Sequence, residues 1–162
     1  MILVAIGANL PDRNGRTPLA TCQNAARALG SIPGLAVGAV SGWFLTAPQP
    51  PAAQPDYVNG VVRLSGTIAP EALLASLQAF EARSGRSRAA PNAARPLDLD
   101  IIAMGNLVRE RPDPVLPHPR AHLRRFVLVP LAEVAPGWVH PVLRRSVEEL
   151  IAALPQTPIR VA

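Results

Sequence analysis

Residues 2–7, ILVAIG, give the first indication of the fold. Five consecutive apolar residues that stop at a glycine are typical of a buried strand ending in a turn. A helix should follow, because Thr17 and Pro18 supply an N-cap and a proline for the first helical position. We expect this helix to end at Gly30 and its apolar face to comprise Leu19, Cys22, Ala26 and Leu29.

Three further strands and a second helix are expected along the chain. Residues 35–46, 57–64 and 97–104 have the pattern of strands, and a helix should begin at Pro70 and end near Ser84. The resulting order is strand, helix, strand, strand, helix, strand. This βαββαβ order predicts an α+β, ferredoxin-like domain with a mainly antiparallel sheet covered by helices.

The last third of the chain is punctuated by prolines. It should add helical turns near 121–134 and a helix over 146–153. A chain of 162 residues with a hydrophobic fraction of 49% is long enough for one core and short for two. We therefore interpret residues 1–162 as a single domain.

Charge and cysteine content restrict the partners and the compartment. All 16 basic residues are arginine, and they outnumber the 11 acidic residues to give a formal net charge of +5. A guanidinium donates two parallel hydrogen bonds to phosphate, so nucleotides and nucleic acids would both satisfy this charge. Cys22 is the only cysteine, and the first apolar run is too short for a membrane span. We expect a cytoplasmic protein with no membrane partner.

The sharpest local feature is the sequence LDLDI at residues 97–101. Strand alternation directs the carboxylates of Asp98 and Asp100 to one face and the apolar residues to the other. Two carboxylates on one face repel each other unless a cation lies between them, and such hard oxygen ligands suit magnesium. The pair therefore indicates a magnesium site, and the alternative is the solvated side of an amphipathic strand.

Three arginines precede the acidic pair in an irregular segment. Arg86, Arg88 and Arg95 place anion-binding groups within one loop of the expected metal site. This combination favours phosphoryl transfer, in which catalysis comes mainly from alignment and charge neutralisation. An exposed basic loop without a ligand is the alternative. A GxxxxGK[ST] phosphate loop is excluded because the sequence has no lysine, and no His/Cys cluster indicates zinc.

Tyr57 and Asn59 alternate onto one face of the third expected strand. An aromatic plane beside an amide fits a flat heterocycle of mixed polarity. A purely structural cross-strand pair is the alternative. His118, in the sequence LPHPR, has the same two interpretations, structural or catalytic.

Taken together, these residues resemble the 6-hydroxymethyl-7,8-dihydropterin pyrophosphokinase family. The resemblance covers most of the chain and comprises IGANL, LTAP, QPDYVN, FEARSGRSR, RPLDLDI, LPHPR and RRFVLVPLAEVAP. It implies a ferredoxin-like fold and the transfer of pyrophosphate from ATP to 6-hydroxymethyl-7,8-dihydropterin. The products would be the pterin diphosphate and AMP, in folate biosynthesis.

The resemblance also implies roles for particular residues. Two Mg²⁺ ions would bind Asp98 and Asp100 and bridge the phosphates of the co-substrate ATP. The pterin would be bound by Thr46, Ala47, Pro48, Tyr57, Asn59 and Phe126. ATP would be bound by Glu81, Arg86, Arg88, Arg95, His118 and Arg124, and the catalytic residues would be Arg86, Arg95, Asp98 and Asp100. For Glu81 the alternative is an exposed helix acid. We expect a monomer that does not bind nucleic acid.

One loop departs from the commonest family pattern. Many members have RWGPR before the acidic pair, whereas this sequence has PNAAR and a loop one residue shorter. We expect kcat to differ more than substrate binding, because loop motion often limits turnover. The residues alone leave three other functions open: a nucleic-acid-binding domain, a protein that binds pterin and nucleotide without efficient transfer, and a two-metal nucleotide transferase with another acceptor.

Overall fold

The computed structural model describes residues 1–48, 51–85 and 96–162. In chain order the elements are β1 (Ile2–Ala8), α1 (Pro18–Leu29), β2 (Leu35–Val40), β3 (Phe44–Thr46), β4 (Tyr57–Gly66), α2 (Pro70–Arg83), β5 (Asp98–Met104), a 3₁₀ helix η1 (Ala121–Leu123), α3 (Arg125–Val134), α4 (Val147–Ala152) and β6 (Arg160–Val161). This is the predicted order, with the second strand divided in two. The helical turns expected near 121–134 are η1 and α3, the helix expected over 146–153 is α4, and β6 was not predicted.

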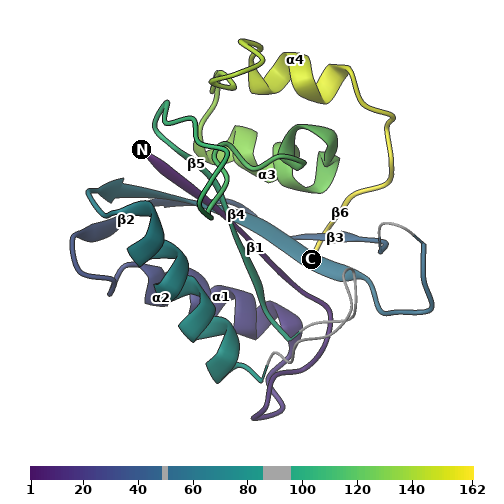
Figure 1. Cartoon of the computed structure of the whole chain (residues 1–162). Coiled ribbons are helices and arrows are strands. Elements are labelled where there is room, and N and C mark those ends of the chain that lie inside the picture. The colour runs from purple at the N-terminus through teal and green to yellow at the C-terminus, as the bar shows by residue number, and fades with distance from the viewer. Residues whose placement is uncertain (49–50, 86–95) are drawn as a thin grey trace.

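The strands form one sheet in the order β5-β1-β4-β3-β6, and β2 also pairs with β4 (Figure 1). All pairs of described strands are antiparallel. The strands on either side of β1, β4 and β5, are thus far from it in the sequence. As its uninterrupted apolar sequence predicts, β1 is an internal strand of the sheet. The predicted α+β, ferredoxin-like fold with a mainly antiparallel sheet is confirmed.

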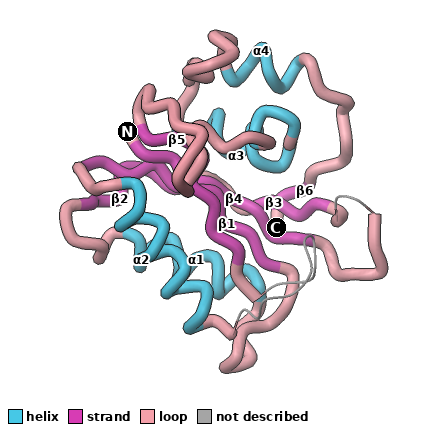
Figure 2. Tube along the Cα trace, in the orientation of Figure 1, coloured by secondary structure: helices cyan, strands magenta, loops and turns pink. Residues whose placement is uncertain are grey.

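Helices cover both faces of the sheet, with α1 and α2 on one face and α3 and α4 on the other (Figures 1 and 2). Alternation along β1 distributes its side chains between two cores. Val4 and Ile6 pack with α1 and α2, whereas Leu3 packs with α3. The same alternation holds in β5, where Leu99 and Ile101 join the first core and Ile102 joins the second.

The expected strand over 35–46 is interrupted at residues 41–43. Ser41 still pairs with β4, because its hydroxyl accepts a hydrogen bond from Val61 N at 2.9 Å. The next N–H, that of Gly42, donates to Glu133 Oε1 of α3 at 2.7 Å instead of to the sheet. The ring of Trp43 lies across β4 at Gly60, where an added Cβ would lie 2.5 Å from it. A contact with a helix far away in sequence therefore breaks the strand.

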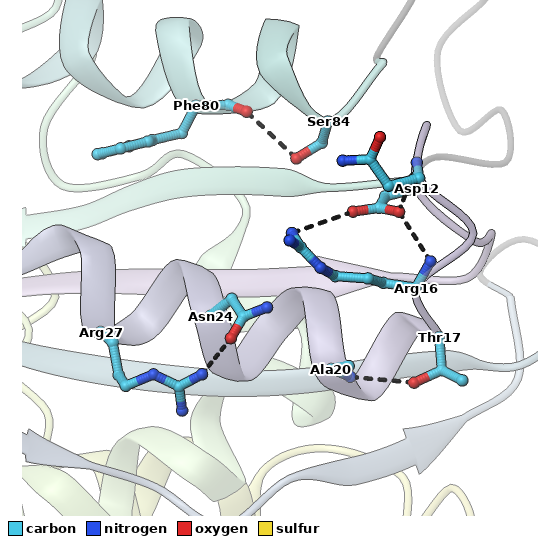
Figure 3. A network of polar contacts seen from close by, with 9 residues as sticks. Asp12, Arg16, Thr17, Ala20, Asn24, Arg27, Phe80 and Ser84 are labelled. Atoms are coloured by element: carbon cyan, nitrogen blue, oxygen red, sulfur yellow. Dashed lines mark hydrogen bonds and ion pairs between the residues drawn. The ribbon is translucent and has the colours of Figure 1, made fainter.

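The predicted ends of α1 and α2 are confirmed. Thr17 Oγ1 accepts a hydrogen bond from Ala20 N at 3.2 Å and caps α1, and Ser84 Oγ donates to Phe80 O at 3.2 Å beyond α2 (Figure 3). Between β1 and α1, Arg13 N donates to Ser84 O at 3.2 Å. The loop after β1 is therefore attached to the carboxyl end of α2.

Candidate active site

A cavity of about 370 Å³ opens on the α3 side of the sheet. Its floor comes from β1, β4 and β5, its side from the end of β3, and its roof from residues 118–127. The lining residues are Ala5, Ile6, Gly7, Thr46, Ala47, Pro48, Tyr57, Asn59, Gly60, Asp98, Asp100, His118, Pro119, Arg120, Arg124, Phe126 and Val127. Ten of the residues predicted for substrate or metal binding are thus brought together.

The aromatic and amide side chains come from paired strands and from α3. Tyr57 pairs with Thr46, and Asn59 pairs with Phe44, across β3 and β4. Tyr57 lines the cavity from β4 and Phe126 from the first turn of α3. The guanidinium of Arg124 lies 5.8 Å from the Phe126 ring centroid. The cavity therefore combines two aromatic walls with a nearby cation.

The amide of Asn59 is held by its neighbours. Its Nδ2 donates to Thr46 Oγ1 at 2.7 Å, and both residues are buried. On the other side, Gly7 pairs with Asn59, and a Cβ at Gly7 would lie 3.0 Å from Asn59 Oδ1. The hydroxyl of Thr46 thus holds the amide in place, and Gly7 leaves room for the carbonyl end.

The carboxylates of Asp98 and Asp100 line the cavity from β5, as alternation predicts. Leu99, between them, is 5% exposed and belongs to the core on the other face. Across β1, Asp98 and Asp100 pair with Gly7 and Ala5, so small residues lie beside both acids. The Asp100 side chain is 36% exposed, which leaves its oxygens accessible from the cavity.

This pair fits a magnesium ion better than a closed transition-metal site. Among residues 1–48, 51–85 and 96–162 no group of three or more His, Cys, Asp or Glu side chains could hold a metal. Magnesium typically takes one or two carboxylates and completes its shell with water and substrate phosphates. Two half-exposed carboxylates at one cavity meet that requirement.

His118 lies beside the acidic pair in its neutral form. Burial and, to a smaller extent, the cation of Arg124 lower the pKa of His118 to about 4, whereas Asp98 acts in the opposite direction. Its Nδ1 accepts a hydrogen bond from Arg120 N at 3.1 Å, so the ring proton is on Nε2. Nε2 is 4.0 Å from Asp100 Oδ2, which is a polar contact rather than an ion pair in the neutral form.

Four predicted residues remain. Arg86, Arg88 and Arg95 are outside the described residues. Glu81 is not among the residues that line the cavity, because α2 packs on the opposite face of the sheet. The alternative interpretation of Glu81 as an exposed helix acid is wrong. Its side chain is buried, and its Oε2 accepts a hydrogen bond from Leu99 N at 2.8 Å.

Sequence reasoning missed Asn9, which is 2% exposed. Its Nδ2 donates to Gln54 Oε1 at 3.0 Å and to Pro55 O at 3.1 Å. Asn9 therefore ties the end of β1 to the segment that leads into Tyr57. The sequence feature that could have identified Asn9 is a polar residue directly after a buried strand, within the motif IGANL.

No helix in the described part of the chain has the length and apolar character needed to cross a bilayer.

The fold and the cavity define a ferredoxin-like protein whose site combines aromatic walls and an amide with a carboxylate pair. Residues 3–136 match the sequence model of the family described as 7,8-dihydro-6-hydroxymethylpterin-pyrophosphokinase (HPPK). The chain belongs to this family.

Individual relatives agree with this assignment. The chain is 40% identical over 138 residues to a Synechocystis 2-amino-4-hydroxy-6-hydroxymethyldihydropteridine pyrophosphokinase, covering 85% of this chain and 70% of the relative. It is 39% identical over 154 residues to the Pseudomonas aeruginosa protein of the same name, covering 95% and 91%. A crystal structure of a Plasmodium falciparum HPPK-DHPS mutant has the same fold, with a TM-score of 0.65 at 12% identity. That match covers 93% of this chain and 43% of the other.

Proposed function

We propose that this cavity is where the chain transfers pyrophosphate from ATP to 6-hydroxymethyl-7,8-dihydropterin, and that the reaction requires Mg²⁺. The reaction is that of the family to which the chain belongs, a step of folate biosynthesis. The observation that supports this use of the cavity is its joint lining by the acidic pair, Asp98 and Asp100, and by Tyr57, Asn59 and Phe126. A planar ring and a metal-bound phosphate would lie side by side there.

The pterin half of the site would use the aromatic walls and the amide. Tyr57 and Phe126 would stack on the two faces of the ring. Asn59, with its amide oriented by Thr46, would hydrogen-bond the polar edge together with the main chain of residues 46–48. A fixed amide costs little further ordering when the ligand binds, so it favours one ring edge over another.

The phosphate half would use the carboxylates and the cations. Asp98 and Asp100 would hold two Mg²⁺ ions, which when bound neutralise charge on the phosphates of ATP. Arg124 and neutral His118 line the same end of the cavity, and Arg86, Arg88 and Arg95 would add cations from outside the described residues. The hydroxymethyl oxygen would bond to the β-phosphorus as the bond from that phosphorus to the AMP oxygen breaks, and the hydroxyl proton would leave to solvent.

Two further expectations stay predictions: that the chain is active as a monomer and that it binds no nucleic acid. Cys22 is buried and free, which agrees with a cytoplasmic setting.

The experiment measures AMP released from ATP and Mg²⁺, with and without 6-hydroxymethyl-7,8-dihydropterin. Pterin-dependent AMP release should fall on the order of 10²-fold or more in Asp98→Asn and Asp100→Asn. The matched control is Glu110→Gln, because Glu110 is an exposed acid outside the cavity. Full activity in either Asp variant would remove the metal assignment.

The same assay separates the other functions. AMP release with a different acceptor but not with the pterin would indicate another nucleotide transferase. Tight pterin and ATP binding without AMP release would indicate a protein that binds both substrates and has lost transfer. Residues 91–95 are PNAAR where many family members have RWGPR, and this makes the second outcome the more informative of the two.

A further inference from the structure

Glu81 is a buried carboxylate that the proposed binding sites do not use. It lies in the last turn of α2 and is 7% exposed. An acid near the carboxyl end of a helix is disfavoured by the helix dipole, and a buried acid also loses hydration. A leucine would satisfy the core at this position at lower cost. The position therefore calls for a specific acceptor.

One partner of Glu81 explains that requirement. Its Oε2 accepts a hydrogen bond from the main-chain N–H of Leu99 at 2.8 Å. Leu99 lies between Asp98 and Asp100, and its side chain points into the core that α1 and α2 cover. The bond therefore reaches the middle of the acidic pair from the face opposite the cavity.

The position of β5 in the sheet makes this bond important. Among the described strands, β5 pairs with β1 alone, so it is an edge strand. Successive N–H groups of a strand point to opposite edges. The N–H of Leu99 therefore points away from β1, while the flanking residues Asp98 and Asp100 face β1 with their main chains. This buried donor has no place in the sheet ladder, and Glu81 supplies its acceptor.

We propose that Glu81 is a positioning residue for the acidic pair. It holds β5 from its outer edge, so that Asp98 and Asp100 keep the common orientation needed to share divalent cations. It acts through Leu99 and contacts neither substrate. The inference rests on the proposed function of Asp98 and Asp100, and it replaces the expectation that Glu81 binds ATP directly.

Three variants separate the acceptor from the charge and the bulk. Glu81→Gln retains an oxygen that can accept from Leu99 N, Glu81→Leu retains volume without an acceptor, and Glu81→Asp retains the charge but withdraws it by one methylene. The matched control is Glu71→Leu. Glu71 belongs to the same helix and pairs with Arg109 far from the cavity, so its loss tests the general effect of weakening α2.

The readout is Mn²⁺ binding, measured by electron paramagnetic resonance with α,β-methylene ATP, which cannot be cleaved at the reacting bond. Outer residues that orient metal ligands typically contribute 10–100-fold to metal affinity. We expect Glu81→Leu and Glu81→Asp to weaken Mn²⁺ binding by about 10-fold or more, with Glu81→Gln and Glu71→Leu close to the parent. Pterin affinity should be unchanged in all four.

Each other result overturns the inference in a recognisable way. Parental Mn²⁺ affinity in a folded Glu81→Leu or Glu81→Asp would show that Glu81 is only structural. Equal losses in Glu81→Gln and Glu81→Leu would show that the charge of Glu81, and not its hydrogen bond to Leu99, is what matters. If Glu81→Leu does not fold, Glu81→Asp carries the comparison. Parental Mn²⁺ binding in Asp98→Asn would instead refute the metal assignment of the proposed function.

Discussion

Asn59 Nδ2 donates a hydrogen bond to Thr46 Oγ1 at 2.7 Å, across the β3–β4 pair and inside the cavity wall. An amide presents a donor at one end and an acceptor at the other, and the two ends have nearly the same size. The hydrogen bond to the Thr46 hydroxyl holds this amide in place at the cavity wall. This relationship gives the pterin assignment its most direct test.

Thr46→Val should weaken pterin binding while the protein stays folded. The buried Asn59 amide would lose its acceptor, a change that costs about 1–3 kcal/mol. Rotation of the amide would account for part of this free-energy cost. We expect the pterin Kd to rise about 10-fold, which corresponds to 1.4 kcal/mol. Titration calorimetry without nucleotide measures the change.

Two controls belong to the Thr46 test. Thr46→Ser keeps the hydroxyl and should bind pterin like the parent. Thr21→Val removes another buried hydroxyl, one without a hydrogen-bond partner among the described residues, and should leave pterin binding unchanged. A parental Kd in Thr46→Val would mean that the Thr46 hydroxyl has no part in orienting Asn59.

Gly7→Ala should have a similar effect from the opposite side of the amide. The new Cβ would lie 3.0 Å from Asn59 Oδ1, closer than an ordinary contact. Asn59 would have to move by a few tenths of an ångström, and we expect the pterin Kd to rise by about 5- to 30-fold, or 1–2 kcal/mol. Fluorescence titration with pterin measures this. Gly30→Ala, at the end of α1 and remote from the cavity, is the control that should bind normally.

Much of the fold and of the cavity follows from local pattern. Alternation predicted that Asp98 and Asp100 share one face and that Leu99 points to the other, because a strand repeats every two residues whatever surrounds it. The caps of α1 also follow from Thr17, Pro18 and Gly30 alone. The resemblance then supplied Phe126, which no periodicity relates to Tyr57.

The features that were not predicted depend on distant contacts. The break at residues 41–43 requires Glu133 of α3, which lies 91 residues from Gly42. The burial of Glu81 depends on how α2 packs beside β5, because its position in the helix sequence is equally compatible with exposure. Asn9 has a role only because Gln54 and Pro55 lie next to the end of β1. Local propensity carries no information on such pairs.

Cys22 should resist alkylation in the folded protein. Burial raises the pKa of its thiol to about 12 from 9.0, and the side chain is fully enclosed on the buried face of α1. A pKa of about 12 in place of 9.0 lowers the thiolate fraction near pH 8.5 by about 10³-fold. Mass spectrometry after iodoacetamide treatment measures the rate, with the same chain in urea as the reference. Equal rates in both would mean that α1 opens readily.

His140 should make the folded state sensitive to acid, although it lies in none of the motifs that predicted the site. It is 4% exposed, its ring packs edge-on against Trp138 and His122, and its Nδ1 accepts hydrogen bonds from Val142 N and Leu143 N. Burial lowers the pKa of His140, and the neighbouring His122 lowers it further. The native environment therefore favours the neutral ring.

The direction of the pH effect follows from this lowered pKa. Protonation is easier in the unfolded chain, so the stabilising contribution of neutral His140 is complete above pH 6.5 and is lost as the pH falls below it. Urea midpoints at pH 7.5 and pH 5.5 should differ in the parent. His140→Asn should reduce that difference, because its amide oxygen can accept from the same two N–H groups without titrating. His122→Asn, which leaves His140 in place, should retain most of it. An identical pH dependence in parent and His140→Asn would show that other groups carry the acid sensitivity.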